Sequence, residues 1–243
     1  CRVVDLSADF RLRDCTVYAE AYGAEHTAPD LLDLAVYGLT EEVRPHLPGA
    51  KLVANPGCYP TSVLLPLKPL IKAGLLDTEA AVVCDCKSGV SGAGNTPGPA
   101  NLFGAVHDNF RAYAVGGHRH APEIRQESGL EQLVFVPHLL PVFRGILSTI
   151  YVRPTNGVSA GDMRDHLRDR WRDEPFVRVL AASDGQPELA AVRSTNRCLV
   201  SLTDQDGYVV ITSVIDNLMK GAAGQAIQNM NLMLGYPEQT GLD

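Results

Sequence analysis

The stretch Lys51-Leu52-Val53-Ala54-Asn55-Pro56-Gly57-Cys58-Tyr59-Pro60-Thr61 carries the local signals that decide the fold. Its first four residues form a short apolar run, which predicts a strand, and Asn55-Pro56-Gly57 stops that strand. A helix is predicted from about Tyr59 to Ala73, because Gly74 then provides a C-terminal signal. The sequence therefore predicts a strand–turn–helix unit with a cysteine at the turn.

Cys58 stands where the turn becomes the helix. A sulfur at a helix start faces unsatisfied backbone N–H groups and the positive end of the helix dipole. Both favour the thiolate over the thiol, and Gly57 lets other groups approach closely. The backbone N–H of Cys58 is also placed to face a developing oxyanion. Local context leaves two interpretations open, a reactive nucleophile or a buried small hydrophobe.

The rest of the chain alternates between β-rich and helical segments, which favours a mixed or antiparallel sheet with helices on one face. Ser159 is predicted to cap a helix, and Asp204-Gln205-Asp206-Gly207 is predicted to turn a hairpin. Pro60 suits a first helical turn, whereas Pro66 and Pro69 are expected to kink or shorten their helix. Strands are predicted over 1–6 (buried), 80–86, 112–115, 133–136, 145–152, 198–202 and 208–214, and helices over 122–128, 159–171 and 217–234.

The composition excludes several classes of protein. Of 243 residues, 45% are hydrophobic and 20% are charged, which suffices for a packed core. The net charge of −7 argues against a nucleic-acid groove. We expect no membrane span and no signal peptide, and six cysteines are too few for a disulfide scaffold, so a reducing, cytoplasmic location is expected. The chain opens in an apolar run without an initiator Met, so a preceding N-terminal segment is expected.

Two histidines, His118 and His120, precede a predicted helix start, a placement that suits acid–base chemistry. Glu123 is expected to orient one of the two rings. The alternative, a solvated pair of loop histidines, stays open at this point. We predict no metal site, because the spacing of Cys84 and Cys86 is tighter than that of usual zinc ligands, and we expect these two side chains to pack in the core.

Three further segments carry residues able to bind a ligand. The loop 88–98 is neither a P-loop nor a dinucleotide fingerprint, yet its glycines can bring backbone N–H groups against a phosphate or a flat ring. A plain surface loop is the alternative. Arg144 either clamps a carboxylate or phosphate or serves as an ion-pair partner. Asn217 is either a ligand-binding residue or only an N-cap.

Five separated motifs together match one family, in the right order. They are residues 55–61 (NPGCYPT), 88–94 (SGVSGAG), 118–124 (HRHAPEI), 137–139 with 144–146 (PHL, RGI), and 216–218 with 220–225 (DNL, KGAAGQ). On these motifs the chain closely resembles the N-acetyl-γ-glutamyl-phosphate reductase family of arginine biosynthesis, within the aspartate-semialdehyde dehydrogenase superfamily. The resemblance runs essentially from end to end, without the N-terminal part that carries the family's glycine-rich dinucleotide fingerprint.

The resemblance implies a fold of the α/β plus α+β class, with a partial doubly wound NADP-binding domain and an inserted mixed-sheet substrate and dimerisation domain. Residues 1–57 and 216–243 would form the first domain, and residues 58–215 the second. It further implies NADP(H) as the cofactor and a small-molecule acyl phosphate as the substrate. The family also implies a homodimer or homotetramer with contacts through the sheet of the substrate domain.

The same resemblance implies roles for individual residues. The Cys58 thiolate would attack the acyl phosphate and expel phosphate, and hydride would then reduce the thioester to a thiohemiacetal that collapses to the semialdehyde. His120 is favoured over His118 as the acid–base group. The implied substrate-binding residues are Arg144, Asn55 and His118, and the implied cofactor-binding residues are Ser88, Gly89, Ser91, Gly92, Ala93, Gly94 and Asn217. Asn95 stands where the family often has a basic residue, which removes one expected phosphate contact.

Three alternatives compete with this interpretation. A Cys–His hydrolase would keep Cys58 and a histidine but use no cofactor, and the loop at 88–94 and the Asn217 motif argue against it. A non-catalytic chain would only dimerise or pack through its substrate domain. A close relative of the reductase would act on a carrier-protein-linked aminoadipyl or glutamyl phosphate instead of the free acylated amino acid.

Overall fold

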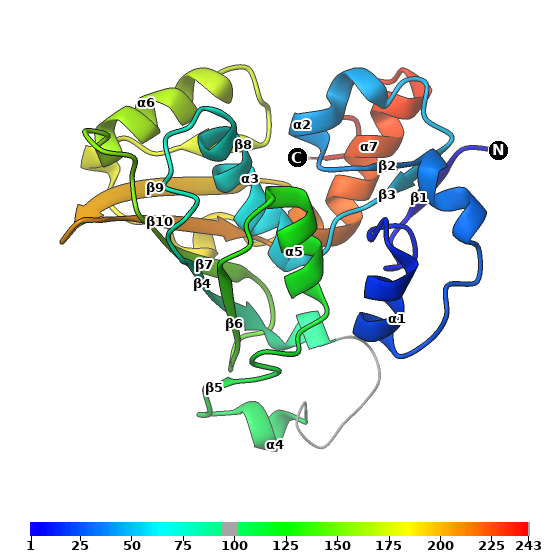
Figure 1. Ribbon diagram of the computed structural model, residues 1–243, viewed down its shortest axis with the longest axis horizontal. Helices are drawn as coiled ribbons and strands as arrows, with labels where there is room; N and C mark the ends of the chain where they lie inside the picture. The colour runs from blue at the N-terminus through cyan, green and yellow to red at the C-terminus, as the bar shows by residue number, and fades with distance from the viewer. Residues whose placement is uncertain (94–101, 243) are drawn as a thin grey trace.

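The computed structural model describes residues 1–93 and 102–242 and contains two sheets with helices packed around them (Figure 1). The smaller sheet is parallel, in the order β1 (Val3–Asp5), β3 (Leu52–Ala54) and β2 (Ala35–Tyr37). The larger is a mixed seven-stranded sheet in the order β5-β6-β4-β7-β10-β9-β8. Its strands are β4 (Val82–Gly89), β5 (Arg111–Ala112), β6 (Leu133–Leu140), β7 (Ile146–Val152), β8 (Val177–Val179), β9 (Cys198–Gln205) and β10 (Tyr208–Ile215).

Helices α3, α5 and α6 lie on one side of the seven-stranded sheet, and α7 packs against the smaller sheet at β1 (Figure 1). The bounds are α1 Cys15–Tyr22, α2 Thr40–Val43, α3 Cys58–Lys72, α4 Phe103–Val106, α5 His120–Ser128, α6 Ala160–Arg170 and α7 Gly224–Leu234. The main core lies between the larger sheet and its helices. The predicted fold class is confirmed, whereas the assignment of residues to two domains stays a prediction.

Helix α3 confirms the predicted strand–turn–helix unit and places Cys58 at its first residue. The expectation that Pro66 and Pro69 shorten this helix was wrong, because it continues to Lys72. Most of its side chains are buried against β7, β10, α5 and α6. This packing offsets the hydrogen bonds that the two prolines remove.

The predicted hairpin and helix cap are confirmed. Strands β9 and β10 pair from Gln205 and Tyr208 outward, so the turn holds only Asp206 and Gly207. Both have positive φ, 47° and 80°, as the tight hairpin turn that suits the strand twist requires. Ser159 and Asp162 form a reciprocal capping box at the start of α6.

Several boundaries differ from the sequence prediction. Strand β1 is not buried, because it forms an edge of the smaller sheet and leaves Val3 45% exposed. Strand β4 continues through Ser88 and Gly89, so the predicted loop begins later, in a short helical turn at Val90–Ala93. The last helix begins at Met219, not Asn217, and its first five residues form a π-helical turn. Helix α1 was not predicted, although Asp14 caps it.

Among the described residues, no helix combines the length and the apolar character needed to cross a membrane.

Candidate active site

Cys58 lines a cavity of about 270 Å³ at the start of α3. Both predicted histidines line it too, as do two arginines, so thiol, imidazole and guanidinium groups surround one small volume. The lining residues are Ala8, Arg11, Tyr22, Cys58, Tyr59, Gly92, Tyr113, His118, Arg119 and His120. They come from the N-terminal segment, α1, α3, the turn after β4, and the segment that leads into α5.

The Cys58 sulfur is a thiol in the free protein, contrary to expectation. Burial raises the pKa of the Cys58 thiol to about 11, although the Tyr59 N–H at the helix start and the Arg11 charge act in the opposite direction. The prediction that the helix start makes a thiolate was wrong, because the desolvation of a buried charge outweighs the helix dipole. A nucleophilic Cys58 therefore needs a base that removes its proton.

His118 is held in one tautomer by hydrogen bonds. Its Nδ1 accepts from the backbone N–H of His120 at 3.1 Å, so its proton lies on Nε2, which is 3.4 Å from the Tyr113 hydroxyl. Tyr113 donates to the Tyr59 hydroxyl at 3.2 Å, and Tyr59 donates to the His138 carbonyl at 3.2 Å. Neither ring nitrogen of His118 is therefore left to accept a proton from the thiol.

Among the described residues, the ring of His120 has no comparable hydrogen bonds. Its Nδ1 is buried and has no partner among the described residues, and its ring packs edge-on against Tyr59 with centroids 5.9 Å apart. Burial lowers the pKa of His120 well below 6.5, so the ring is neutral and can accept a proton. Its Nε2 lies so close to Gly57 that a methyl group there would come within 2.5 Å of it. The ring therefore lies beside the residue that precedes Cys58.

Gly57→Ala tests this close approach. Gly57 has φ −64° and ψ 158°, which alanine adopts without strain, so the effect passes through the displaced His120 ring. We expect the protein to fold and any kcat that depends on Cys58 and His120 to fall at least about tenfold. Gly49→Ala is the control, because its new methyl group meets no atom within 4 Å. Equal kcat values for the two variants would contradict the placement of His120.

Glu123 does not orient a histidine ring, and that expectation was wrong. Its Oε1 accepts hydrogen bonds from the Gly57 N–H and the Tyr37 hydroxyl, both at 2.8 Å, and its Oε2 lies 3.7 Å from the Arg11 guanidinium. Burial raises the pKa of Glu123, and the Arg11 charge opposes that shift. Glu123 thus fixes the turn in front of Cys58, where one carboxylate oxygen receives two donors.

The predicted substrate residues Arg144 and Asn55 are not among the residues that line the cavity. Arg144 lies 3.5 Å from the Asp216 carboxylate and donates to the Ser194 hydroxyl at 3.1 Å. Asn55 is buried, and its amide donates to the Ala222 carbonyl at 3.2 Å. Both residues are thus bonded to the segment after β10, and roles for them in substrate binding stay predictions.

Two of the predicted cofactor residues, Asn217 and Ser91, are bonded to each other. Asn217 Oδ1 accepts from the Gly145 N–H at 2.7 Å and its Nδ2 donates to the Ser91 hydroxyl at 3.0 Å. Asn217 is therefore not the helix cap; Asp216 Oδ1 accepts from the N–H groups of Leu218 and Met219. Ser88 and Gly89 end β4, and Gly92, in the turn with Ser91 and Ala93, lines the Cys58 cavity. Gly94, and Asn95 with it, lie outside the described residues.

Sequence reasoning missed the cationic and aromatic lining of the cavity. Arg11 and Tyr22 belong to the N-terminal part of the chain, Tyr113 precedes the histidine motif, and Arg119 stands between its two histidines. Only the histidine neighbours carried a local signal, because they stand within a few residues of His118. Arg11 donates to the Leu6 carbonyl at 2.9 Å, five residues away in the sequence, and to the Asn55 carbonyl at 2.8 Å, 44 residues away. No local pattern reports the second pairing.

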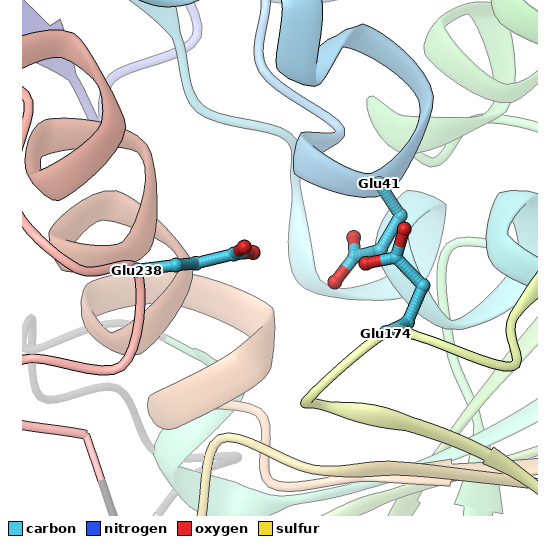
Figure 2. Close-up of side chains that lie close together, drawn as sticks. All are labelled: Glu41, Glu174 and Glu238. Atoms are coloured by element: carbon cyan, nitrogen blue, oxygen red, sulfur yellow. The ribbon is translucent and has the colours of Figure 1, made fainter.

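Three glutamates gather away from this cavity, where Glu41, Glu174 and Glu238 turn their carboxylates toward one another (Figure 2). Arg44 donates to Glu174 through two nitrogens, with Nη1 at 2.6 Å, and to Glu238 at 2.8 Å. Lys220 Nζ lies 2.5 Å from Glu41 Oε1, and both side chains are fully buried. Each carboxylate thus has a cationic partner from the chain, so we interpret the cluster as an ion-pair network.

Comparison with known proteins places the chain in a family. Residues 58–217 match the family model of the semialdehyde dehydrogenase dimerisation domain. An N-acetyl-gamma-glutamyl-phosphate reductase from Magnetococcus marinus is 53% identical over 249 residues, covering all of this chain and 71% of that protein. The same enzyme from Neisseria gonorrhoeae is 49% identical over 250 residues, again covering the whole chain and 71% of the relative.

Solved structures support the fold. A probable aspartate-semialdehyde dehydrogenase from Pseudomonas aeruginosa superposes with a TM-score of 0.68 at 17% identity, covering 96% of this chain and 72% of that one. Aspartate semialdehyde dehydrogenase II from Vibrio cholerae gives a TM-score of 0.65 at 16% identity, covering 84% of this chain and 69% of that one. With these matches and the relatives above, the chain belongs to the N-acetyl-gamma-glutamyl-phosphate reductase family of semialdehyde dehydrogenases.

Proposed function

We propose that the protein interconverts N-acetyl-glutamyl 5-phosphate and N-acetyl-glutamate 5-semialdehyde plus phosphate with NADP(H), in arginine biosynthesis, through a thioester on Cys58. The observation that carries the proposal is the shared cavity of Cys58 and a neutral His120 whose Nδ1 is unpartnered among the described residues. Arg11 and Arg119 give the same cavity a positive charge, which suits a phosphorylated carboxylic acid.

The residues beside Cys58 fit the flat ring of a nicotinamide. Gly92 lines the cavity. A methyl group at this position would come 2.7 Å from the Ser88 hydroxyl, so a larger residue would collide with Ser88. Asn217 keeps one amide hydrogen and one Oδ1 lone pair beyond its two bonds to the chain. Ser88, Gly89, Ser91, Gly92, Ala93 and Asn217 would hold the nicotinamide end. When bound, NADPH supplies the hydride that the thioester carbon receives.

The protein's own residues handle the protons. His120 takes the proton from the Cys58 thiol as sulfur attacks the acyl carbon, which matches a thiol that is protonated at neutral pH. The carbon–oxygen bond to phosphate then breaks and phosphate leaves. The Cys58 N–H at the start of α3 and the Arg11 charge face the negative charge that develops on oxygen. During reduction, the proton held by His120 passes to the oxygen and forms the thiohemiacetal hydroxyl. That hydroxyl returns the proton to His120, the carbon–sulfur bond breaks with its electron pair on sulfur, and His120 then protonates the sulfur to restore the Cys58 thiol.

The reverse reaction provides the assay that separates this function from its competitors. The full-length protein is mixed with the semialdehyde, NADP and inorganic phosphate, and NADPH formation is followed by absorbance. We expect NADPH to form only when all three are present. Hydrolysis of a thiol-reactive ester without NADPH formation would favour the Cys–His hydrolase instead. Comparing free and carrier-linked acyl phosphates in the forward direction identifies the acyl group.

We further propose that two copies of the chain pair through the outer face of the seven-stranded sheet. Leu147, Thr149, Val210 and Thr212 are half-buried on that face, and their strands β7 and β10 are paired in register. The match to a dimerisation domain supports this arrangement. We expect Thr212→Arg to shift the sedimentation coefficient toward that of a smaller assembly, because a charge would be buried at the contact. An unchanged sedimentation coefficient would contradict this contact face.

A further inference from the structure

The π-helical turn Met219–Ala223 lies directly behind Cys58. Its hydrogen bonds run from the Gly221 N–H to the Asp216 carbonyl and from the Ala223 N–H to the Leu218 carbonyl, both at 3.0 Å. Such turns are rare and are often found at functional sites. Here the extra residue per turn brings a glycine backbone against the residue that carries the thiol.

Gly221 leaves no space between this turn and Cys58. A methyl group on Gly221 would come 2.8 Å from Cys58 Cβ, 3.2 Å from its Cα and 3.3 Å from Ile215 Cδ1. Two of these three atoms belong to the start of α3, and the Cα is backbone that cannot rotate away. Cys58 lines the cavity while Gly221 does not, so Cys58 stands between the turn and the cavity.

Buried polar side chains hold the turn in place. Lys220 Nζ donates to Glu41 Oε1 at 2.5 Å and to Gln228 Oε1 at 2.8 Å, and all three side chains are fully or almost fully buried. Glu41 is one of the three neighbouring glutamates that Figure 2 shows. The turn is thus anchored to α2 and to α7 by groups whose separation would leave charges buried without partners.

The turn is also held on the side of the smaller sheet. Asn55 Nδ2 donates to the Ala222 carbonyl at 3.2 Å, and Asn55 directly follows β3. Asp216 Oδ1 accepts from the N–H groups of Leu218, just before the turn, and Met219, its first residue, at 2.8 and 3.1 Å. The same turn is therefore fixed at its start, its middle and its end.

We propose that this anchored π-turn is a rigid stop that sets the position of the Cys58 sulfur relative to His120, with Gly221 and Lys220 as positioning residues. This inference rests on the proposed function, in which Cys58 attacks the substrate. Displacing a reacting atom by about 1 Å can lower the reaction rate about a hundredfold. The turn that packs against Cys58 on the side away from the cavity therefore affects turnover directly.

Gly221→Ala in the full-length protein is the test. The added methyl pushes Cys58 toward the cavity, so we expect kcat to fall at least about tenfold with a smaller change in KM. We also expect the pH midpoint of Cys58 alkylation by iodoacetamide to fall below that of the parent, because the thiol becomes better solvated. Ala223→Ser is the matched control, because Ala223 lies in the same turn but is exposed.

A second variant tests the buried Lys220–Glu41 pair that anchors the turn, and it leaves Gly221 unchanged. Lys220→Met with Glu41→Gln removes both charges together, so neither is left buried alone. We expect a severalfold lower kcat and a shifted alkylation midpoint, with a cooperative melting transition retained.

A Gly221→Ala protein whose kcat and alkylation profile both match the parent would overturn the proposal. Absence of reductase activity in the parent would contradict the proposed function, while the alkylation midpoints would still decide the role of the turn.

Discussion

Cys58→Ser is expected to abolish the reductase reaction, with kcat lower by at least about 10³-fold. The serine oxygen holds its proton far more tightly than the thiol and forms an ester where the thiol forms a thioester, so both the attack and the hydride acceptance suffer. NADPH formation from the semialdehyde, NADP and phosphate measures the loss. The melting temperature should change little, because the substitution alters one atom at the first residue of α3.

Cys15→Ser is the control for Cys58→Ser. Cys15 is also only partly buried, but it lies at the start of α1 and is not among the residues that line the cavity. We expect this variant to keep the parent's kcat. Turnover that survived in Cys58→Ser and was lost in Cys15→Ser would reject Cys58 as the nucleophile.

His120→Asn is expected to lower kcat by about 10²- to 10⁴-fold, the usual contribution of a general base. His118→Asn should cost less, because the asparagine carbonyl can still accept the His120 N–H that now bonds to His118 Nδ1. Steady-state kinetics of the two variants therefore decides which histidine moves the proton. A larger loss in His118→Asn than in His120→Asn would contradict the assignment.

The pH dependence of kcat/KM tests the same assignment, that of His120 as the base. Burial holds the pKa of His120 well below 6.5, so its ring stays neutral, and available as a base, as the pH falls through 6.5. The kcat/KM of the unsubstituted protein should therefore not fall by half near pH 6.5, where an ordinary histidine becomes protonated. An acidic limb of kcat/KM centred at pH 6.5 would show that a solvated histidine is the base.

The strand–turn–helix unit around Cys58 and the hairpin of β9 and β10 could be predicted because their signals are local. The backbone changes direction at a glycine in each case. These glycines are Gly57 between β3 and α3, Gly74 after α3, and Gly207 between β9 and β10. The capping box at Ser159 is of the same kind. Such elements are fixed by neighbours in sequence, so a single sequence suffices to find them.

The protonation state of Cys58 could not be predicted in the same way. The helix start was correctly placed, yet burial by segments far away in sequence reverses the sign of the pKa shift. Arg11, Tyr37 and Gly221 approach the start of α3 from distant parts of the chain, and the π-turn at Met219 has no sequence signature that distinguishes it from an ordinary helix start. These features depend on tertiary packing, which periodicity and capping signals do not report.

The proposed reaction depends most on an acyl thioester at Cys58, and this species can be measured directly. The full-length protein is mixed with the acyl phosphate without NADPH, quenched in acid, digested and analysed by peptide mass spectrometry. We predict the acyl mass on the peptide that contains Cys58, its removal by hydroxylamine, and its absence in Cys58→Ser. A catalytically active protein with no acyl group on that peptide, or with the group on another residue, would contradict the proposed reaction.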